Sequence, residues 1–186
     1  MADKKELKGI FKVAIILFAI TSVAAAVLAA VNSVTAPVIA ENDKKAQEIA
    51  MKAVLPKATL FGKMEYQVNE ESSVTEIYLS DAGYAVKAAP KGYGGAISMI
   101  VGVDNDLKVT GVEIISQSET AGLGAKCTNS GFKAQFIGKT ENIVVSKNGA
   151  KDNEIDAITS ATITSKATTK GVNDAIKVVK EAKGDE

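Results

Sequence analysis

The 186-residue sequence contains no histidine and no arginine, and it has a single cysteine. The absence of histidine removes the commonest metal ligand and the usual general base near neutral pH. One cysteine cannot form an internal disulfide bond or hold an iron–sulfur cluster by itself. The sequence therefore lacks the usual residues for zinc binding, haem ligation and acid–base hydrolysis. Redox activity would require an organic cofactor.

The formal net charge of the chain is zero. The 22 basic residues equal the 22 acidic residues, and every basic residue is lysine. We therefore expect no nucleic-acid partner. Without arginine the chain also lacks the bidentate guanidinium group that binds a free phosphate or carboxylate ligand. The length allows one ordinary domain with an appendage.

The amino-terminal part contains a long apolar run. Residues 13–40 carry no charge, and residues 13–31 are apolar apart from Thr21 and Ser22. Nineteen helical residues span about 28 Å, close to the hydrocarbon thickness of a bilayer. This predicts a transmembrane helix over residues 13–34, in contact with membrane lipid.

Four lysines lie directly before this run, at Lys4, Lys5, Lys8 and Lys12, whereas the first charged residues after it are acidic. Positive charge marks the cytoplasmic side, so residues 1–12 should be cytoplasmic and the body of the chain extracytoplasmic, at the cell membrane. A cleaved signal peptide is the alternative, with residues 24–26 (Ala-Ala-Ala) as a cleavage site. The length of the run favours an uncleaved anchor.

Residues 35–56, with Pro37 near their start, are predicted to form a connecting helix that is stopped by Pro56. Four strands with short turns between them follow, predicted at Thr75–Leu79, Tyr84–Ala88, Ala96–Val103 and Val109–Ile115. They indicate an antiparallel β-meander, whose nearly all-apolar strand 96–103 should be covered on both faces. With helices on either side of the meander, residues 57–186 are expected to be one α+β domain.

The last helix is predicted from an apolar stripe, and a cluster of hydroxyl side chains comes before it. Positions 172, 175, 176 and 179 are apolar, which is the spacing of one helix face. The hydroxyl cluster consists of Thr159, Ser160, Thr162, Thr164 and Ser165. One interpretation is an N-cap, at Thr164 or Ser165. The other is a modification site, because a helix start favours a phosphate that a neighbouring hydroxyl could hold as an ester.

Two glycine clusters, residues 92–95 and 119–125, flank the third and fourth predicted strands. Glycines of this kind are typical of turns, and they also let the backbone approach a planar ligand closely. Neither cluster has the pattern of a P-loop or of a dinucleotide-binding fingerprint.

The hydroxyl cluster resembles the flavinylation motif of the FMN-binding domain family. Asp156, Thr159, Ala161 and Thr162 match that motif, and Ser160 stands where glycine is usual. The order of the other motifs is similar to the G subunit of the Rnf electron-transport complex, and more distantly to the C subunit of the sodium-pumping NADH:quinone reductase. These motifs are residues 92–95 (Gly-Tyr-Gly-Gly), residues 119–124 (Glu-Thr-Ala-Gly-Leu-Gly) and Phe132 with Gln135-Phe136.

The resemblance implies that Thr162 carries FMN through a phosphoester bond. It also implies that Ser160 and Thr164 stabilise the phosphate charge and that Thr159 and Ala161 belong to the same motif. The residues expected beside the flavin ring are Glu119, Thr120, Gly122, Leu123 and Gly124, and Gly94 and Gly95 complete the cofactor-binding set. No catalytic triad or metal site is expected.

The implied function is electron transfer within a multisubunit membrane complex, between ferredoxin and NAD, coupled to sodium-ion or proton translocation. Its partners would be other membrane subunits and, for maturation, a flavin transferase. Two alternatives remain open: a flavinylated extracytoplasmic carrier of another respiratory chain, and a membrane-tethered interaction module without redox activity.

Overall fold

The computed structural model describes residues 4–65, 71–147 and 149–184. The chain divides into two compact units, Met1–Lys44 and Lys45–Glu186. Residues 1–3 of the predicted cytoplasmic segment lie outside the described residues.

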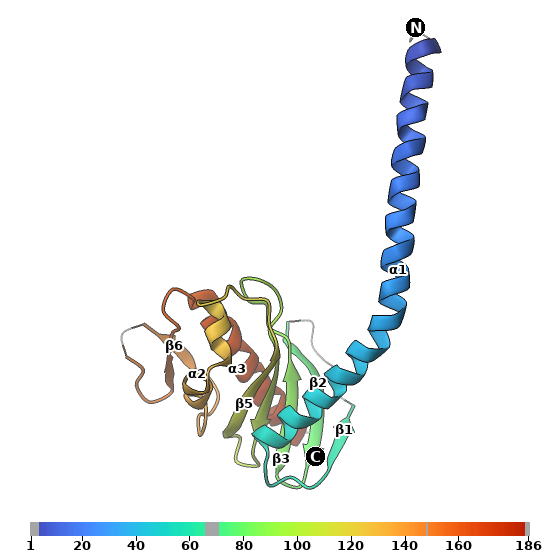
Figure 1. The fold of residues 1–186 in the computed structure, drawn as a ribbon. Coiled ribbons are helices and arrows are strands. Elements are labelled where there is room, and N and C mark those ends of the chain that lie inside the picture. The colour runs from blue at the N-terminus through green and yellow to red at the C-terminus, as the bar shows by residue number, and fades with distance from the viewer. Residues whose placement is uncertain (1–3, 66–70, 148, 185–186) are drawn as a thin grey trace. The chain divides into compact units, whose positions relative to one another are not determined.

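The first element is helix α1, Lys4–Val54, which continues through Pro37 (Figure 1). The expectation of two helices, over residues 13–34 and 35–56, is therefore wrong. A break at Pro37 would leave several N–H and C=O groups without partners at the two new helix ends, whereas an unbroken helix loses one hydrogen bond. Side chains 9–45 are all exposed, and this helix is long and apolar enough to cross a membrane.

The second unit is built on a five-stranded antiparallel sheet in the order β1-β2-β3-β4-β5. Its strands are β1 (Phe61–Met64), β2 (Val74–Ser80), β3 (Gly83–Ala88), β4 (Ser98–Val103) and β5 (Val109–Ser116). The predicted four-strand meander is confirmed as β2 to β5. Strand β1 is an additional edge strand. Its four residues are too few to show a strand pattern in the sequence.

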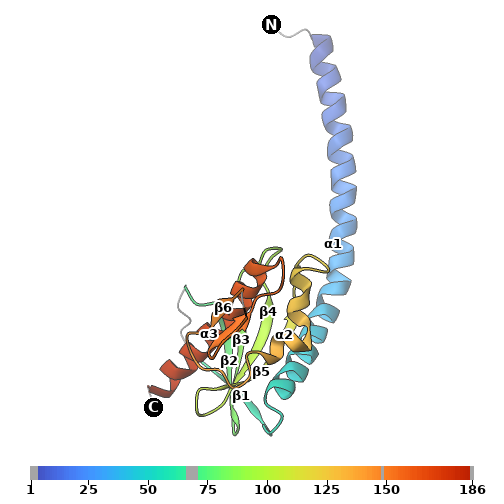
Figure 2. The ribbon, with the colours of Figure 1, turned by 90° about the vertical axis from the view of Figure 1, so that its left-hand side faces the viewer.

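Helices cover both faces of the sheet, as Figure 2 shows for α3 and residues 45–54 of α1. Helix α3 (Thr162–Gly184) packs its predicted stripe on one face, where residues 172, 175, 176 and 179 are fully buried. The last turn of α1 packs on the other face with Ile100. Strand β4 is consequently buried on both sides, as its composition predicted.

A pair of glycines lets the end of α1 approach the sheet closely. Gly102 of β4 and Gly111 of β5 are direct cross-strand partners. A Cβ atom at Gly102 would lie 2.8 Å from the carbonyl oxygen of Val54, and one at Gly111 would lie 3.1 Å from its Cα. The hydroxyl of Thr110 donates a hydrogen bond to the same Val54 oxygen at 2.7 Å, which ties the helix end to β5.

Short elements fill the chain between β5 and α3. They are the 3-10 helix η1 (Gly124–Thr128), helix α2 (Ser130–Ala134), and strands β6 (Val144–Ser146) and β7 (Glu154–Asp156). Strands β6 and β7 form a separate parallel pair. Phe132 and Phe136 are buried with their rings edge to face at 5.6 Å, which attaches α2 to the main core.

Candidate functional site

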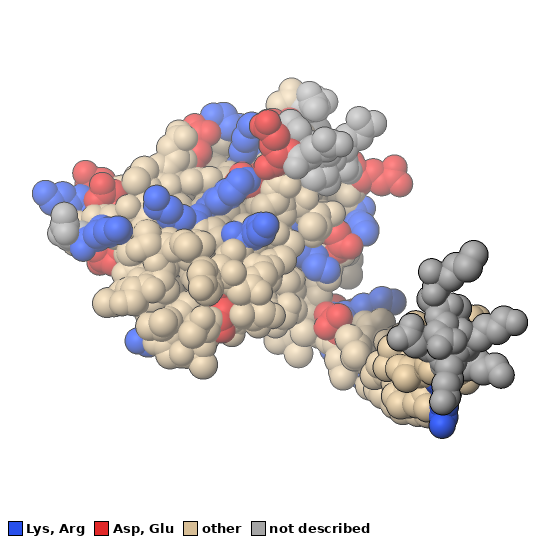
Figure 3. Space-filling view, turned by 90° about the horizontal axis from the view of Figure 1, so that it is seen from above, with Lys and Arg blue, Asp and Glu red and all other residues tan. Residues whose placement is uncertain are grey.

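Three segments that are distant in sequence meet around one cavity of about 610 Å³, here called the α3 cavity. They are the glycine loop between β3 and β4, the glycine-rich segment after β5, and the first turn of α3. The lining residues are Tyr93, Glu119, Thr120, Leu123, Gly124, Ser160, Ala161, Thr162, Ile163 and Thr164. Figure 3 views the domain from above the orientation of Figure 1, and an uncharged area lies there beside several lysine side chains.

Glu119 connects the three walls of the α3 cavity. Its side chain is 8 % exposed. One carboxylate oxygen accepts the N–H of Gly94 at 2.9 Å, and the other accepts the hydroxyl of Thr164. The same residue thereby fixes the glycine loop and the start of α3, although Thr164 lies 45 positions further along the chain.

Two glycines leave the space that the Glu119 carboxylate occupies. A Cβ atom at Gly92 would lie 2.4 Å from one carboxylate oxygen, and a Cβ at Gly124 would lie 2.7 Å from the other. Any larger residue would displace the carboxylate. One glycine of each cluster is therefore required by close packing against Glu119.

The start of α3 is shaped by hydroxyl groups that do not act as N-caps. Ser165 accepts the N–H of Ile158 at 2.9 Å and donates to the carbonyl of Ala161 at 3.0 Å. Thr164 donates to Glu119. The N-cap interpretation for Thr164 or Ser165 is therefore wrong, because α3 begins earlier, at Thr162.

Several polar groups at this helix start are left available for a ligand. The first α3 amide bonded to a carbonyl of the preceding turn is that of Ser165, with Ala161 at 3.0 Å. Within the described part of the chain, the N–H groups of residues 162–164 have no acceptor. The half-buried hydroxyl of Thr162 likewise has no partner among the described residues and lines the cavity.

Ser160, directly before this turn, has a φ of 62°. This left-handed conformation is unfavourable for residues with a Cβ atom and is readily adopted by glycine. The backbone at this position therefore has the geometry for which the related motif uses glycine.

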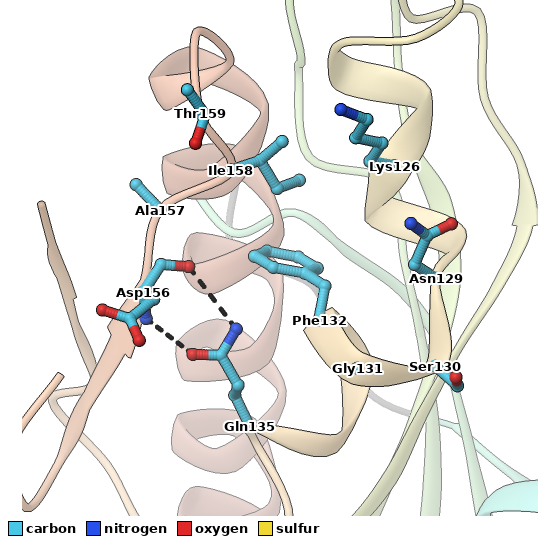
Figure 4. A pocket seen from close by; sticks show the side chains of 10 residues that line it. All are labelled: Lys126, Asn129, Ser130, Gly131, Phe132, Gln135, Asp156, Ala157, Ile158 and Thr159. Carbon is cyan, nitrogen blue, oxygen red and sulfur yellow. Dashed lines mark hydrogen bonds between the residues drawn. The ribbon is translucent and has the colours of Figure 1, made fainter. Parts of the chain in front are cut away.

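A second depression, here called the α2 cleft, lies on the other side of the segment before α3 and has a volume of about 570 Å³. Figure 4 shows residues 156–159 on one wall and residues of η1 and α2 on the other. At one end the side-chain amide of Gln135 is hydrogen-bonded to both backbone groups of Asp156. The Asp156 carboxylate points the other way and accepts the N–H of Ala150 at 2.7 Å.

The structure brings most of the predicted site residues together but not all of them. Eight line the α3 cavity: Glu119, Thr120, Leu123, Gly124, Ser160, Ala161, Thr162 and Thr164. Thr159 lines the α2 cleft instead. Gly94 contributes through its N–H bond to Glu119, whereas Gly95 and Gly122 do not line the cavity.

Tyr93 and Ile163 line the cavity and were not anticipated from the sequence. Tyr93 lies between two glycines of the cluster at residues 92–95. An aromatic residue in this position was the feature of the sequence that could have indicated a ligand contact. Ile163 directly follows Thr162 on a helix, and nothing local distinguishes it from a core residue.

Cys127 is buried close to this site. Burial and the negative charge of Glu119 raise the pKa of its thiol. The thiol therefore stays protonated and unreactive near neutral pH. Among the described residues, no group of three or more acidic, histidine or cysteine side chains could hold a metal ion.

The chain matches two protein-family models. Residues 92–177 match the FMN-binding domain, and residues 1–54 match the RnfG N-terminal region. The first of these ranges includes every residue that lines the α3 cavity. The second ends at Val54, which is also the last residue of α1.

Curated relatives match along almost the whole length. The chain is 40 % identical to the G subunit of the Na(+)-translocating ferredoxin:NAD(+) oxidoreductase complex of Acetobacterium woodii, with 92 % of each chain covered. It is 35 % identical to the G subunit of the proton-translocating ferredoxin:NAD(+) oxidoreductase complex of Clostridium ljungdahlii, with 96 % of each covered.

The fold has a solved counterpart in the C subunit of the Na(+)-translocating NADH-quinone reductase of Parabacteroides distasonis. The TM-score is 0.58 at 19 % identity, over 75 % of this chain and 92 % of that one. At this identity the likeness concerns the fold alone. Taken with the two family matches and the full-length relatives, the chain belongs to the family of G subunits of Rnf-type ferredoxin:NAD(+) oxidoreductase complexes and contains an FMN-binding domain.

Proposed function

We propose that this protein is the electron-carrying G subunit of an Rnf-type membrane complex and that FMN is attached covalently through a phosphoester to Oγ1 of Thr162. The complex would transfer electrons between ferredoxin and NAD and couple this transfer to sodium-ion or proton translocation. The observation that carries the proposal is the Thr162 hydroxyl, which has no partner among the described residues and lies at a helix start that lines a cavity of about 610 Å³.

The residues present fit the phosphate end of FMN. The N–H groups of residues 162–164, which have no acceptor in the described parts of the chain, and the positive end of the α3 dipole favour a negative group at this position. The phosphate would thus be held by one covalent bond and by backbone donors. This arrangement needs no arginine, and the sequence contains none.

The other hydroxyls of the cluster have different roles in this proposal. Thr164 and Ser165 are committed to bonds that fix the start of α3 relative to Glu119 and Ile158. Thr159 faces the α2 cleft. Ser160 is exposed at the cavity edge, where it could donate to a phosphate oxygen. Within this cluster, and counting bonds to the described residues, Thr162 alone has a free hydroxyl, lines the cavity and belongs to the helix.

The cavity also has room for the flavin ring. Its size lies in the range of small-molecule and cofactor sites. The Glu119 contacts keep the glycine loop and α3 at a fixed separation, so the two walls are formed before a ligand binds. When bound, FMN supplies the redox chemistry, accepting and donating one or two electrons. The chain itself holds the phosphate and shapes the walls.

The apolar helix would anchor this domain in the cell membrane with the amino terminus in the cytoplasm. The lysine excess before residue 13 supports this orientation. Covalent attachment suits an extracytoplasmic carrier, because flavin that dissociated there could not be replaced from the cytoplasmic pool. External protease on sealed right-side-out vesicles should digest residues 45–186, and full protection would show the opposite orientation.

The attachment is tested on the intact chain. Co-expression with a flavin transferase should add the mass of one FMN less one water, and the denatured band should fluoresce on a gel. Expression in a host without such an enzyme should give folded protein of unmodified mass. Unmodified mass in both hosts would contradict the proposal, as would a covalent flavin in the host that lacks the enzyme.

A further inference from the structure

Tyr93 is an exposed aromatic side chain at the rim of the α3 cavity. It is 72 % exposed, and it is the single aromatic residue among those that line the cavity. Within the described part of the chain it makes no hydrogen bond and no ring contact. Ligand pockets are commonly lined by hydrophobic and aromatic side chains, so an aromatic ring exposed at the rim of this cavity is a candidate ligand contact.

The loop that carries Tyr93 is held at several points. Lys91 and Ala96 form an antiparallel bridge across it. The N–H of Gly92 donates to the carbonyl of Gly95 at 2.7 Å. The N–H of Gly94 donates to Glu119 at 2.9 Å. The backbone on both sides of Tyr93 is therefore fixed, and the ring is presented to the cavity by an ordered turn.

The surroundings of Tyr93 match one class of ligand. Leu123 and Ile163 also line the cavity and are 41 % and 55 % exposed. Three side chains with exposed apolar surface thus line the cavity that Thr162 also lines. A flat aromatic ring system tethered at Thr162 would cover such side chains, and aromatic pairs prefer offset stacked or edge-to-face arrangements.

We propose that Tyr93 provides the aromatic surface against which the isoalloxazine ring rests once FMN is attached. This inference rests on the proposed function and adds a specific contact to it. Tyr93 shields one side of the ring from solvent. Because a phenol is a good electron donor to an excited flavin, a stacked Tyr93 also quenches flavin fluorescence. Glu119 acts indirectly, because its bond to Gly94 fixes the turn that carries Tyr93.

The test uses the full-length flavinylated protein in detergent with Tyr93→Phe, Tyr93→Leu and the control Ile137→Ala. Ile137 is 57 % exposed and does not line the α3 cavity. Intact mass gives the flavin content, and fluorescence yield, lifetime and iodide quenching are measured per attached flavin. Because Tyr93 is exposed, its substitution should leave the fold intact, and expressing each optical quantity per attached flavin removes any difference in flavin content.

Tyr93→Leu should raise the fluorescence yield severalfold and increase quenching by iodide. Tyr93→Phe should raise the yield but keep the ring shielded from iodide, because phenylalanine stacks without donating an electron readily. Ile137→Ala should match the unsubstituted protein. If Tyr93→Leu leaves both yield and iodide quenching unchanged in protein whose mass shows attached flavin, Tyr93 does not contact the ring. Absence of flavin from the unsubstituted protein would instead contradict the proposed function.

Discussion

Gln135 and Asp156 form a two-point contact that joins α2 to the segment leading into α3. The Oε1 atom of Gln135 accepts the N–H of Asp156 at 2.6 Å, and its Nε2 atom donates to the carbonyl of Asp156 at 3.5 Å. The side chain thereby occupies the edge of β7 opposite β6 (Figure 4). Two motifs that lie 21 positions apart are connected through this one amide.

Gln135→Ala should slow flavin attachment, because residues 156–160 lose a contact that sets their position relative to the domain. Loss of these hydrogen bonds should also lower the free energy of unfolding by about 1 kcal/mol. Gln135→Glu keeps the acceptor for the Asp156 N–H and should retain more of the attachment rate. The rate is measured as flavin fluorescence gained by apoprotein incubated with the transferase. An attachment rate equal to that of the unsubstituted protein would show that the contact is structural only.

A polar network fastens the carboxy-terminal part of α1 to the sheet and should make stability depend on pH. The Tyr78 hydroxyl donates to Glu76 at 2.6 Å and accepts from Gln47 at 2.7 Å. Burial, followed by the hydrogen bond to Glu76, raises the pKa of Tyr78 to about 12. The hydrogen bond from Tyr78 is the largest influence on Glu76 and, with Lys63 and Lys87, lowers the pKa of its carboxyl.

The neutral tyrosine is favoured in the folded state, so its contribution to stability is complete below pH 10 and is lost as the pH rises towards 12. Tyr78→Phe should therefore have a smaller loss of stability over this interval than the unsubstituted protein. Urea unfolding of both proteins at several alkaline pH values measures the difference. Parallel curves would mean that Tyr78 ionises alike in the folded and unfolded states.

Ser160→Gly should stabilise the fold by up to about 1 kcal/mol. The φ of 62° costs a residue with a Cβ atom about 1–2 kcal/mol, and the greater freedom of glycine in the unfolded chain offsets part of the gain. Ser160→Ala keeps the Cβ atom and serves as the control, which should not be stabilised. The midpoints of chemical unfolding in detergent give both values, and a lower midpoint for Ser160→Gly would contradict the strain argument.

Much of the fold follows from extended patterns in the sequence. The uncharged run of residues 13–31, the strands β2 to β5 with their short turns and the apolar stripe of α3 are all long enough to be recognised by their composition or spacing. Strands β1, β6 and β7 have three or four residues, too few for a period to appear. Helix α1 continues through Pro37 because an unbroken helix loses fewer backbone hydrogen bonds than two separate helices would. The proline by itself does not indicate which of these alternatives is favoured.

The candidate site was predictable where a motif is contiguous and not where contacts are remote. The contiguous motif of residues 156–162 drew attention to the segment around Thr162, and residues 160–162 do line the α3 cavity. The role of Glu119 depends on Thr164 and Gly94, at 45 and 25 positions away, and no local pattern reports such distances. The left-handed conformation of Ser160, by contrast, agrees with the usual glycine at this position of the motif.

Thr162→Ala should abolish covalent flavin while the fold survives. The substitution removes the ester oxygen but no hydrogen bond within the described part of the chain, and alanine is a better helix former than threonine. Thr162→Ser keeps a hydroxyl at the same place and should retain attachment, whereas Thr159→Ala removes an exposed hydroxyl of the α2 cleft and should leave attachment unaffected.

Thr164→Ala and Ser165→Ala differ from these because they remove buried hydrogen bonds, so their first effect should be a lower free energy of unfolding by about 1–3 kcal/mol. Intact mass and in-gel fluorescence after denaturation measure attachment for the whole series, and unfolding midpoints measure the fold. A fluorescent band from denatured Thr162→Ala protein would place the attachment on another residue, and the cavity around α3 would then need a different ligand.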